Sequence, residues 1–114
     1  MLKTNLTHVI SEKDHSELLT SNENVMICCG RMGPMCIPVY EVMEELEGEY
    51  KNIKFADMEF DSPDAKIIRN LPECRSFQGL PFVVYYKNGQ VVKATSSIQS
   101  RDQITSILDE QFSK

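Results

Sequence analysis

The sequence predicts an α/β fold with a central mixed sheet and helices on both of its faces. Stretches of strand type alternate with stretches of helical periodicity in the order β-α-β-α-β-α-β-β-α. Strands that alternate with helices pair in parallel, because each helical crossover returns the chain in the same direction. An Asn-Gly pair at residues 88–89 is typical of a tight hairpin, which adds antiparallel strands at one edge.

Composition limits the class of protein. A chain of 114 residues has room for one core, so we expect a single domain over residues 1–114. The net charge is −5 and the basic residues are scattered, which argues against nucleic acid as a partner. We see neither a secretory signal nor an apolar run of membrane-spanning length, and we expect no membrane partner and a cytoplasmic location. Cysteines in that compartment are redox, metal-binding or plain core residues.

The first half of the chain begins with a β-rich run at residues 7–10. Ser11 then has the position of a capping residue for a brief helix at about residues 12–20. The second strand covers residues 25–29 and consists of apolar residues. The helix after it presents a core-facing stripe at three- and four-residue steps, namely Cys36, Val39, Tyr40, Met43 and Leu46.

The second half begins with a third strand at residues 53–60. A third helix is expected at about residues 63–71, with a proline in its first turn. Strands at residues 82–86 and 91–94 flank the Asn-Gly turn. A second capping box, starting at Ser100, opens the final helix.

Three of the four cysteines lie where the second strand leads into its helix, at Cys28, Cys29 and Cys36. A thiol near a helix N-terminus is close to the positive end of the backbone dipoles, which favours the reactive thiolate. Cys36 is therefore our candidate reactive residue. The alternative is a small core residue, since unpaired cysteine is among the most buried residue types.

Two prolines leave two possible starts for this helix. If Pro34 is the first helical residue, Pro38 removes an internal hydrogen bond and kinks the helix. If the helix begins at Pro38 instead, residues 30–37 form a loop and Cys36 lies just outside the helix. Both versions leave the sulfur near the positive end of the dipole, and the second exposes it more.

Three motifs carry a resemblance to a known family: Gly-Pro-Met-Cys at residues 33–36, Gly-Leu-Pro at residues 79–81 and Tyr-Lys-Asn-Gly at residues 86–89. Together with the element order, they resemble the thioredoxin family. The resemblance covers the chain from about residue 7 to residue 112. Extra residues around 62–76 interrupt it, and we interpret them as a longer third helix and exit loop.

The family's active-site pattern is Trp-Cys-Gly-Pro-Cys, and this chain departs from the family at several positions. The alignment puts Met32 in the place of the tryptophan, Gly33 in that of the attacking cysteine and Cys36 in that of the resolving cysteine. Ile27 takes the place of the shielded carboxylate, and Asp57 that of the lysine opposite it. Ordinary CxxC dithiol chemistry is therefore not available.

A partner thiol for Cys36 has three candidates. Cys28 and Cys29 point to opposite sides of the sheet, so one of them can face Cys36 and the other cannot. We favour Cys29, because the resemblance gives it the place of an aromatic residue beside the active site. A Cys29–Cys36 bond needs α-carbons within about 7 Å of each other. The alternative for Cys28 and Cys29 is that both are small apolar residues of a buried strand. Cys74 is a further candidate, although an isolated surface or half-buried cysteine explains it better.

The resemblance also implies a substrate-binding edge. Pro81 should follow a cis peptide bond, and the backbone beside Leu80 and Pro81 should bind an extended substrate peptide. Met35, together with Met32, would line this surface as a flexible apolar residue. The alternative role for the two methionines is to supply soft ligands for Cu(I). We expect neither a resident metal nor a cofactor.

Asp57 stands in the middle of the third strand. A carboxyl group there would be desolvated and its pKa raised, so it could take or give the proton that thiol exchange requires. The alternative is a residue at the strand end that is hydrogen-bonded or solvated and has no role in chemistry.

The sequence thus predicts a thioredoxin-like thiol–disulfide oxidoreductase with atypical cysteine spacing, in which Cys36 acts with Cys29. Its partners would be a protein or small-molecule disulfide and a thioredoxin-reductase-type electron donor, or a small thiol where no internal thiol can reach. The main alternative is a redox-inactive binding module that presents the Met-rich loop and the edge at Leu80 and Pro81. Soft-metal handling is a third interpretation.

Overall fold

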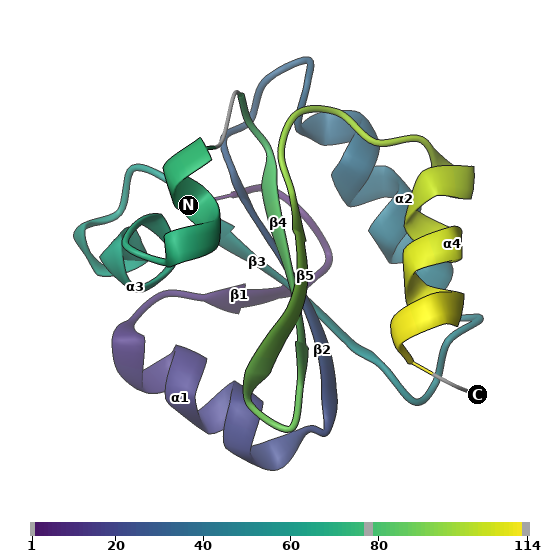
Figure 1. The fold of residues 1–114 in the computed structure, drawn as a ribbon. Coiled ribbons are helices and arrows are strands. Elements are labelled where there is room, and N and C mark those ends of the chain that lie inside the picture. The colour runs from purple at the N-terminus through teal and green to yellow at the C-terminus, as the bar shows by residue number, and fades with distance from the viewer. Residues whose placement is uncertain (1, 77–78, 113–114) are drawn as a thin grey trace.

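A five-stranded mixed sheet runs through the centre of the protein (Figure 1). The computed structural model describes residues 2–76 and 79–112. The strands stand in the order β1-β3-β2-β4-β5, with bounds β1 Thr7–Val9, β2 Asn24–Gly30, β3 Lys54–Glu59, β4 Phe82–Lys87 and β5 Gln90–Thr95. The predicted mixed sheet is confirmed: β1, β3 and β2 are parallel, and β4 and β5 pair antiparallel at one edge.

The register of these strands determines which side chains meet near the candidate site. Asp57 in β3 is paired with His8 on one side and with Cys28 on the other. Cys29 is paired with Phe82 across the antiparallel β2–β4 ladder. Gly30 follows Cys29 in β2 and is paired with Glu59 of β3.

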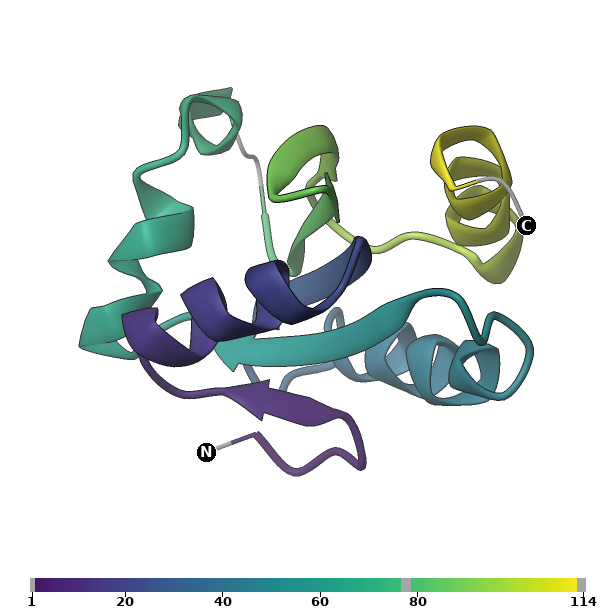
Figure 2. The same cartoon turned by 90° about the horizontal axis from the view of Figure 1, so that it is seen from below.

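Helices cover both faces of the sheet, as expected. They are α1 Glu12–Ser21, α2 Ile37–Glu47, α3 Lys66–Arg69 and α4 Arg101–Gln111. Residues of α2 and α4 pack in one core cluster, and residues of α1 and α3 pack in the other. In the view from below, α2 and α4 lie on one side of the strands and α3 on the other (Figure 2). A full capping box between Ser100 and Gln103 starts α4, as predicted.

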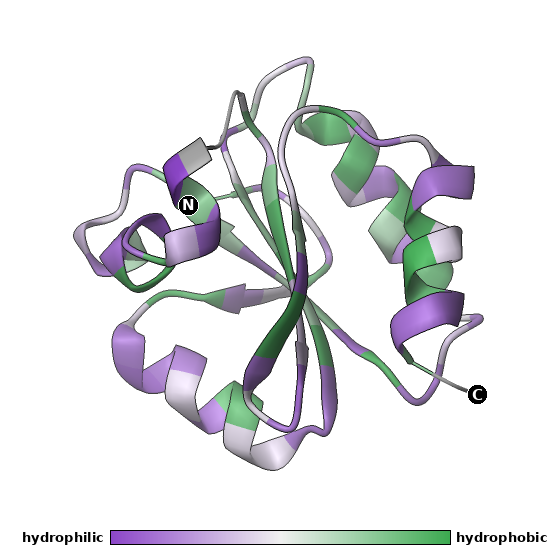
Figure 3. Ribbon diagram, viewed as in Figure 1, coloured by the Kyte–Doolittle hydropathy of each residue, from purple (hydrophilic) through white to green (hydrophobic). Residues whose placement is uncertain are grey.

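The core is divided by the sheet into two layers, and both are apolar. Hydrophobic residues are concentrated along the central strands, whereas much of α1 is hydrophilic (Figure 3). All seven residues of β2 are buried, because helices cover the strand from both sides. No helix in the described part of the chain has both the length and the apolar character of a membrane span.

The segment after β3 differs from the expectation of one long helix over residues 63–71. A 3₁₀ turn at Pro63–Ala65 leads into α3, which has only four residues, and a second 3₁₀ segment, η2, covers Pro72–Ser76. Proline disfavours helical geometry in the residue before it, so Pro72 ends the helix. The extra residues therefore form short 3₁₀ turns and not a longer helix.

The hairpin turn follows the sequence prediction. Asn88 and Gly89 both have positive φ angles, of 52° and 79°. These are the angles that the tight turn requires, and glycine adopts them without steric cost.

Candidate functional site

Cys36 is the N-cap residue of α2, and its side chain points into the protein. The helix begins at Ile37 with Pro38 in its first turn, where a missing N–H group costs nothing. Cys36 is only 3% exposed. The structure therefore agrees with the second of the two expected arrangements, in which Cys36 lies in a loop just before the helix. The expectation that this arrangement exposes the Cys36 sulfur more is wrong.

The sulfur of Cys36 is held by close packing and by a backbone donor. The backbone N–H of Arg31 donates to Cys36 Sγ at 3.4 Å. Tyr40, one turn into α2, donates from its hydroxyl to the Arg31 carbonyl at 3.2 Å. A Cβ atom added to Gly30 would lie 2.8 Å from both the sulfur and the Tyr40 hydroxyl. Glycine at position 30 thus makes room for the thiol.

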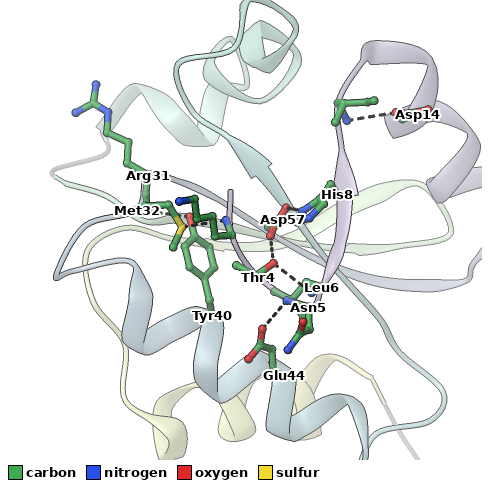
Figure 4. A network of polar contacts seen from close by, with 12 residues as sticks. Thr4, Asn5, Leu6, His8, Asp14, Arg31, Met32, Tyr40, Glu44 and Asp57 are labelled. Atoms are coloured by element: carbon green, nitrogen blue, oxygen red, sulfur yellow. Dashed lines mark hydrogen bonds and ion pairs between the residues drawn. The ribbon is translucent and has the colours of Figure 1, made fainter. Parts of the chain in front are cut away.

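The loop in front of Cys36 exposes two methionines. Met32 is 42% exposed and Met35 is 46% exposed. The backbone N–H of Lys3 donates to Met32 Sδ at 3.3 Å (Figure 4). Arg31 forms an exposed ion pair with Asp61 at 2.7 Å. These contacts hold the loop over the buried sulfur.

The peptide bond between Leu80 and Pro81 is cis, the isomer that the resemblance implies. Pro81 directly precedes Phe82, which is paired with Cys29 in the β2–β4 ladder. Leu80 packs against the core cluster that contains Cys36. The cis bond therefore lies at the same sheet edge as the start of α2.

Cys28 and Cys29 lie on opposite sides of the sheet, but the preference for Cys29 as the residue facing Cys36 is wrong. Cys28 shares the core cluster of Cys36, whereas Cys29 belongs to the other cluster, together with Cys74. Side chains alternate along β2, so Cys28 and Gly30 face α2 and Cys29 faces away from it. All four cysteines are free and buried.

Burial has a large effect on the two strand thiols. It raises the pKa of Cys28 well above its ordinary value and raises the pKa of Cys29 to about 12. Neither residue is a ready source of thiolate in this state.

Asp57 is buried in the middle of β3, as predicted, and is 1% exposed. Burial raises the pKa of its carboxyl, and hydrogen bonds from its neighbours act in the opposite direction. Thr4 donates to Asp57 Oδ2, and His8 Nδ1 lies 2.6 Å from Asp57 Oδ1 (Figure 4). The alternative of a residue at the strand end does not hold, although the carboxyl is hydrogen-bonded.

Sequence reasoning missed the two partners of this carboxyl. His8 is 27% exposed and connects Asp57 to the surface, and Thr4 precedes β1. The parallel pairing of β1 with β3 places His8 directly beside Asp57. A histidine in the first expected strand and an aspartate in the third were the available signal.

No family model matches the chain, and no curated protein matches it in sequence. Solved structures do match. Plasmodium falciparum thioredoxin has a TM-score of 0.77 and 18% identity, covering 93% of this chain and 99% of that one. Saccharomyces cerevisiae mitochondrial thioredoxin 3 in its oxidised form has a TM-score of 0.75 and 18% identity, covering 92% and 94%.

A mutant thioredoxin from Entamoeba histolytica adds a TM-score of 0.73 at 23% identity, covering 92% of this chain and 98% of that one. The chain has a thioredoxin-like fold. At these identities, the likeness concerns the fold, and the chemistry has to be argued from the residues of this chain.

Only part of the site predicted from the sequence comes together in the structure. The structure brings Cys36, Cys28 and Asp57 to one face of the sheet, and the cis bond before Pro81 to the same edge. Cys29 lies outside this set. Among residues 2–76 and 79–112, no three His, Cys, Asp or Glu side chains gather closely enough to hold a metal ion.

Proposed function

We propose that this protein exchanges disulfides through Cys36. The observation that supports this most directly is the position of the sulfur, which lies at the N-cap of α2, accepts the Arg31 N–H and packs on Gly30. The helix start and the N–H donor stabilise negative charge that develops on this atom. The thioredoxins among the structural neighbours support the same class of chemistry.

The reaction has three exchange steps. The Cys36 thiolate attacks a substrate disulfide, one substrate sulfur leaves as a thiolate, and the other becomes bonded to Cys36. An external thiol then attacks Cys36 Sγ, and the second substrate sulfur leaves as a thiolate. A second external thiol attacks the sulfur that is now bonded to Cys36, which forms the external disulfide and releases Cys36 as the thiolate. A small thiol or a dithiol electron donor of the thioredoxin-reductase type supplies the last two steps.

An external thiol fits the structure better than an internal one. Cys28 is the cysteine that shares the Cys36 cluster, but it is fully buried and burial raises its pKa. A thiol that stays protonated is a poor nucleophile. We therefore assign the resolving step to a thiol from outside the chain.

Attack on a substrate requires the loop of residues 31–35 to move away from the sulfur. The contacts that hold this loop include the Arg31–Asp61 ion pair and the hydrogen bond to Met32, both of which are solvent-exposed. Exposed ion pairs contribute only about 0–1 kcal/mol. Opening the loop is therefore inexpensive.

Substrate recognition is assigned to the exposed edge around the same loop. Met35 offers a flexible apolar side chain, and the backbone around Leu80 and Pro81 offers a site for an extended polypeptide. We propose that a protein substrate binds here with its disulfide above Cys36.

Asp57 is proposed as the group that transfers the proton. It lies on the same face as Cys28, its raised pKa brings it closer to the neutral range, and His8 connects it to solvent. Replacing Asp57 with Asn should change the pH profile of thiol exchange. An unchanged profile would remove this role.

The test of the proposal is reduction of a protein disulfide by the full chain in the presence of a small thiol. Cys36→Ser should abolish turnover, while Cys28→Ser and the matched control Cys29→Ser should keep it. Turnover by Cys36→Ser equal to that of the unmodified chain would refute the proposal.

A second candidate function is supported by the burial of the thiols. Cys36 is nearly inaccessible, and Gly33 stands where the fold's attacking cysteine would be. A binding module without redox chemistry would use the same Met35 and Leu80 surface. In that case, the unmodified chain shows no turnover and Cys36→Ser binds extended peptides as well as the unmodified chain does.

A further inference from the structure

The residues that precede β1 are fastened to the side of the molecule that holds Cys36. Leu2 is only 4% exposed and belongs to the core cluster that contains Cys36 and Tyr40. Leu6, directly before β1, is equally buried in the same cluster. Buried leucines therefore anchor both ends of a short segment, residues 2–5, which we call the strap.

Hydrogen bonds tie the middle of the strap to β3 and to α2 (Figure 4). The Thr4 hydroxyl donates to Asp57 Oδ2 and accepts the backbone N–H of Leu6 at 3.1 Å. The backbone N–H of Asn5 donates to Glu44 Oε2 at 2.6 Å. Asp57 is buried, so loss of the Thr4 donor would leave a buried oxygen without this partner, which is costly.

The strap also reaches the loop that covers the Cys36 sulfur. The backbone N–H of Lys3 donates to Met32 Sδ at 3.3 Å. Met32 directly follows Arg31, whose N–H donates to Cys36 Sγ and whose carbonyl accepts from the Tyr40 hydroxyl. The strap is therefore bonded to the residue next to the one that holds the sulfur in place.

We propose that the strap is an autoinhibitory element, which keeps the loop of residues 31–35 closed over Cys36 and opens together with that loop before the sulfur reacts. This regulation rests on the proposed function, because it controls the thiol through which disulfides are exchanged. The loop's own exposed contacts are weak, whereas the strap adds a contact to a buried carboxyl and a buried leucine. The strap precedes the first strand, so it can detach by local opening while the sheet stays paired.

The experiment measures how fast iodoacetamide alkylates each thiol of the folded full chain. Cleavage after Lys and Arg places Cys36 in the peptide of residues 32–51 and both strand cysteines, Cys28 and Cys29, in that of residues 14–31. Mass spectrometry follows the two peptides in the same sample. Opening of the strap alone speeds the alkylation of the 32–51 peptide, whereas a general loosening of the fold speeds that of both peptides.

The first variant removes the polar contact of the strap to β3. Thr4→Val keeps the shape of the side chain but loses the hydroxyl, and the alkylation of Cys36 should become about fivefold faster or more. Thr4→Ser keeps the hydroxyl and should restore the rate of the unmodified chain. His8→Gln changes a partner of Asp57 that lies outside the strap, so the rate should stay close to that of the unmodified chain.

The second variant removes the apolar anchor. Leu2→Ala takes a buried side chain out of the core cluster, and the alkylation of Cys36 should become about threefold faster or more. Lys3→Ala is the matched control. The Lys3 side chain is exposed and its bond to Met32 uses the backbone N–H, so the rate should not change. Circular dichroism checks that each variant is folded.

The strap is overturned if folded Thr4→Val or folded Leu2→Ala alkylates Cys36 no faster than the unmodified chain, or if the 14–31 peptide accelerates by the same factor. Failure of the proposed function has a different signature. In that case, Thr4→Val exposes Cys36 to iodoacetamide and still reduces no protein disulfide. Turnover by the unmodified chain, with Cys36 alkylation unchanged in both variants, removes the strap and keeps the proposed function.

Discussion

Cys36 and Gly30 are packed against each other so closely that residue 30 cannot carry a side chain without displacing the sulfur. A Cβ atom at Gly30 would lie 2.8 Å from Cys36 Sγ. Gly30 directly follows Cys29, and the partner of Cys29 in the sheet, Phe82, directly follows Pro81. This contact connects the thiol, the sheet edge and the cis bond in one place.

Gly30→Ala should destabilise the protein by roughly 1–3 kcal/mol, because the new methyl group overpacks the thiol and the Tyr40 hydroxyl. Urea unfolding measures this change. The matched control is Gly33→Ala, where the added atom meets nothing within 4 Å and the change should stay within about 0.5 kcal/mol. Equal stability of the two variants would contradict the packing described for Cys36.

Gly33→Cys should give the fold an attacking thiol two residues before the end of the loop. The position is open, so the new side chain fits without repacking. We expect reduction of a protein disulfide to rise at least tenfold over the unmodified chain, since an accessible thiolate is the nucleophile. Gly33→Ser is the control and should show no gain.

Loosening the loop should expose Cys36. Asp61→Asn removes the charge that pairs with Arg31, and the exposed pair contributes little to overall stability. We expect alkylation of Cys36 to become about twofold faster or more, with stability changed by less than about 0.5 kcal/mol. Mass spectrometry of the 32–51 peptide follows the rate. An unchanged rate would show that this ion pair does not limit access.

The pH dependence of stability provides a test of the buried carboxyl. The pKa of Asp57 is raised in the folded state, so the folded protein binds more protons than the unfolded chain in the window above the ordinary value of 3.8. The Asp57 contribution to stability therefore falls as pH rises through that window. Asp57→Asn lacks this decrease, and its free energy of unfolding relative to the unmodified chain should rise with pH. Urea unfolding from pH 3.8 upwards measures the difference, and a relative stability that falls with pH would contradict the shift.

The general architecture could be predicted because its signals are local. Helical periodicity, the Asn-Gly turn and the capping box at Ser100 each act over a few residues, and the structure follows them. The length of the third helix was overestimated. Pro72 disfavours helical geometry in the residue before it, and this effect outweighs the helical periodicity of the segment.

The side of the sheet that each cysteine faces could not be predicted. Every residue of β2 is buried, so the strand has no polar–apolar alternation that would identify its α2 face. The partners of Asp57 could not be predicted either. His8 lies beside Asp57 because of the β1–β3 register, which depends on pairing between segments far apart in the sequence. Position 36 was identified from its place at a helix start, while its burial came from tertiary packing.

The most direct test of the account is to identify the sulfur that the folded protein offers to a disulfide. The native chain is treated briefly with an aromatic disulfide that releases a coloured thiolate, and the labelled peptide is identified. We predict that the peptide of residues 32–51, which contains Cys36, is labelled first, and that Cys36→Ser leaves this peptide unlabelled. Labelling of Cys36 only after denaturation would contradict the central claim.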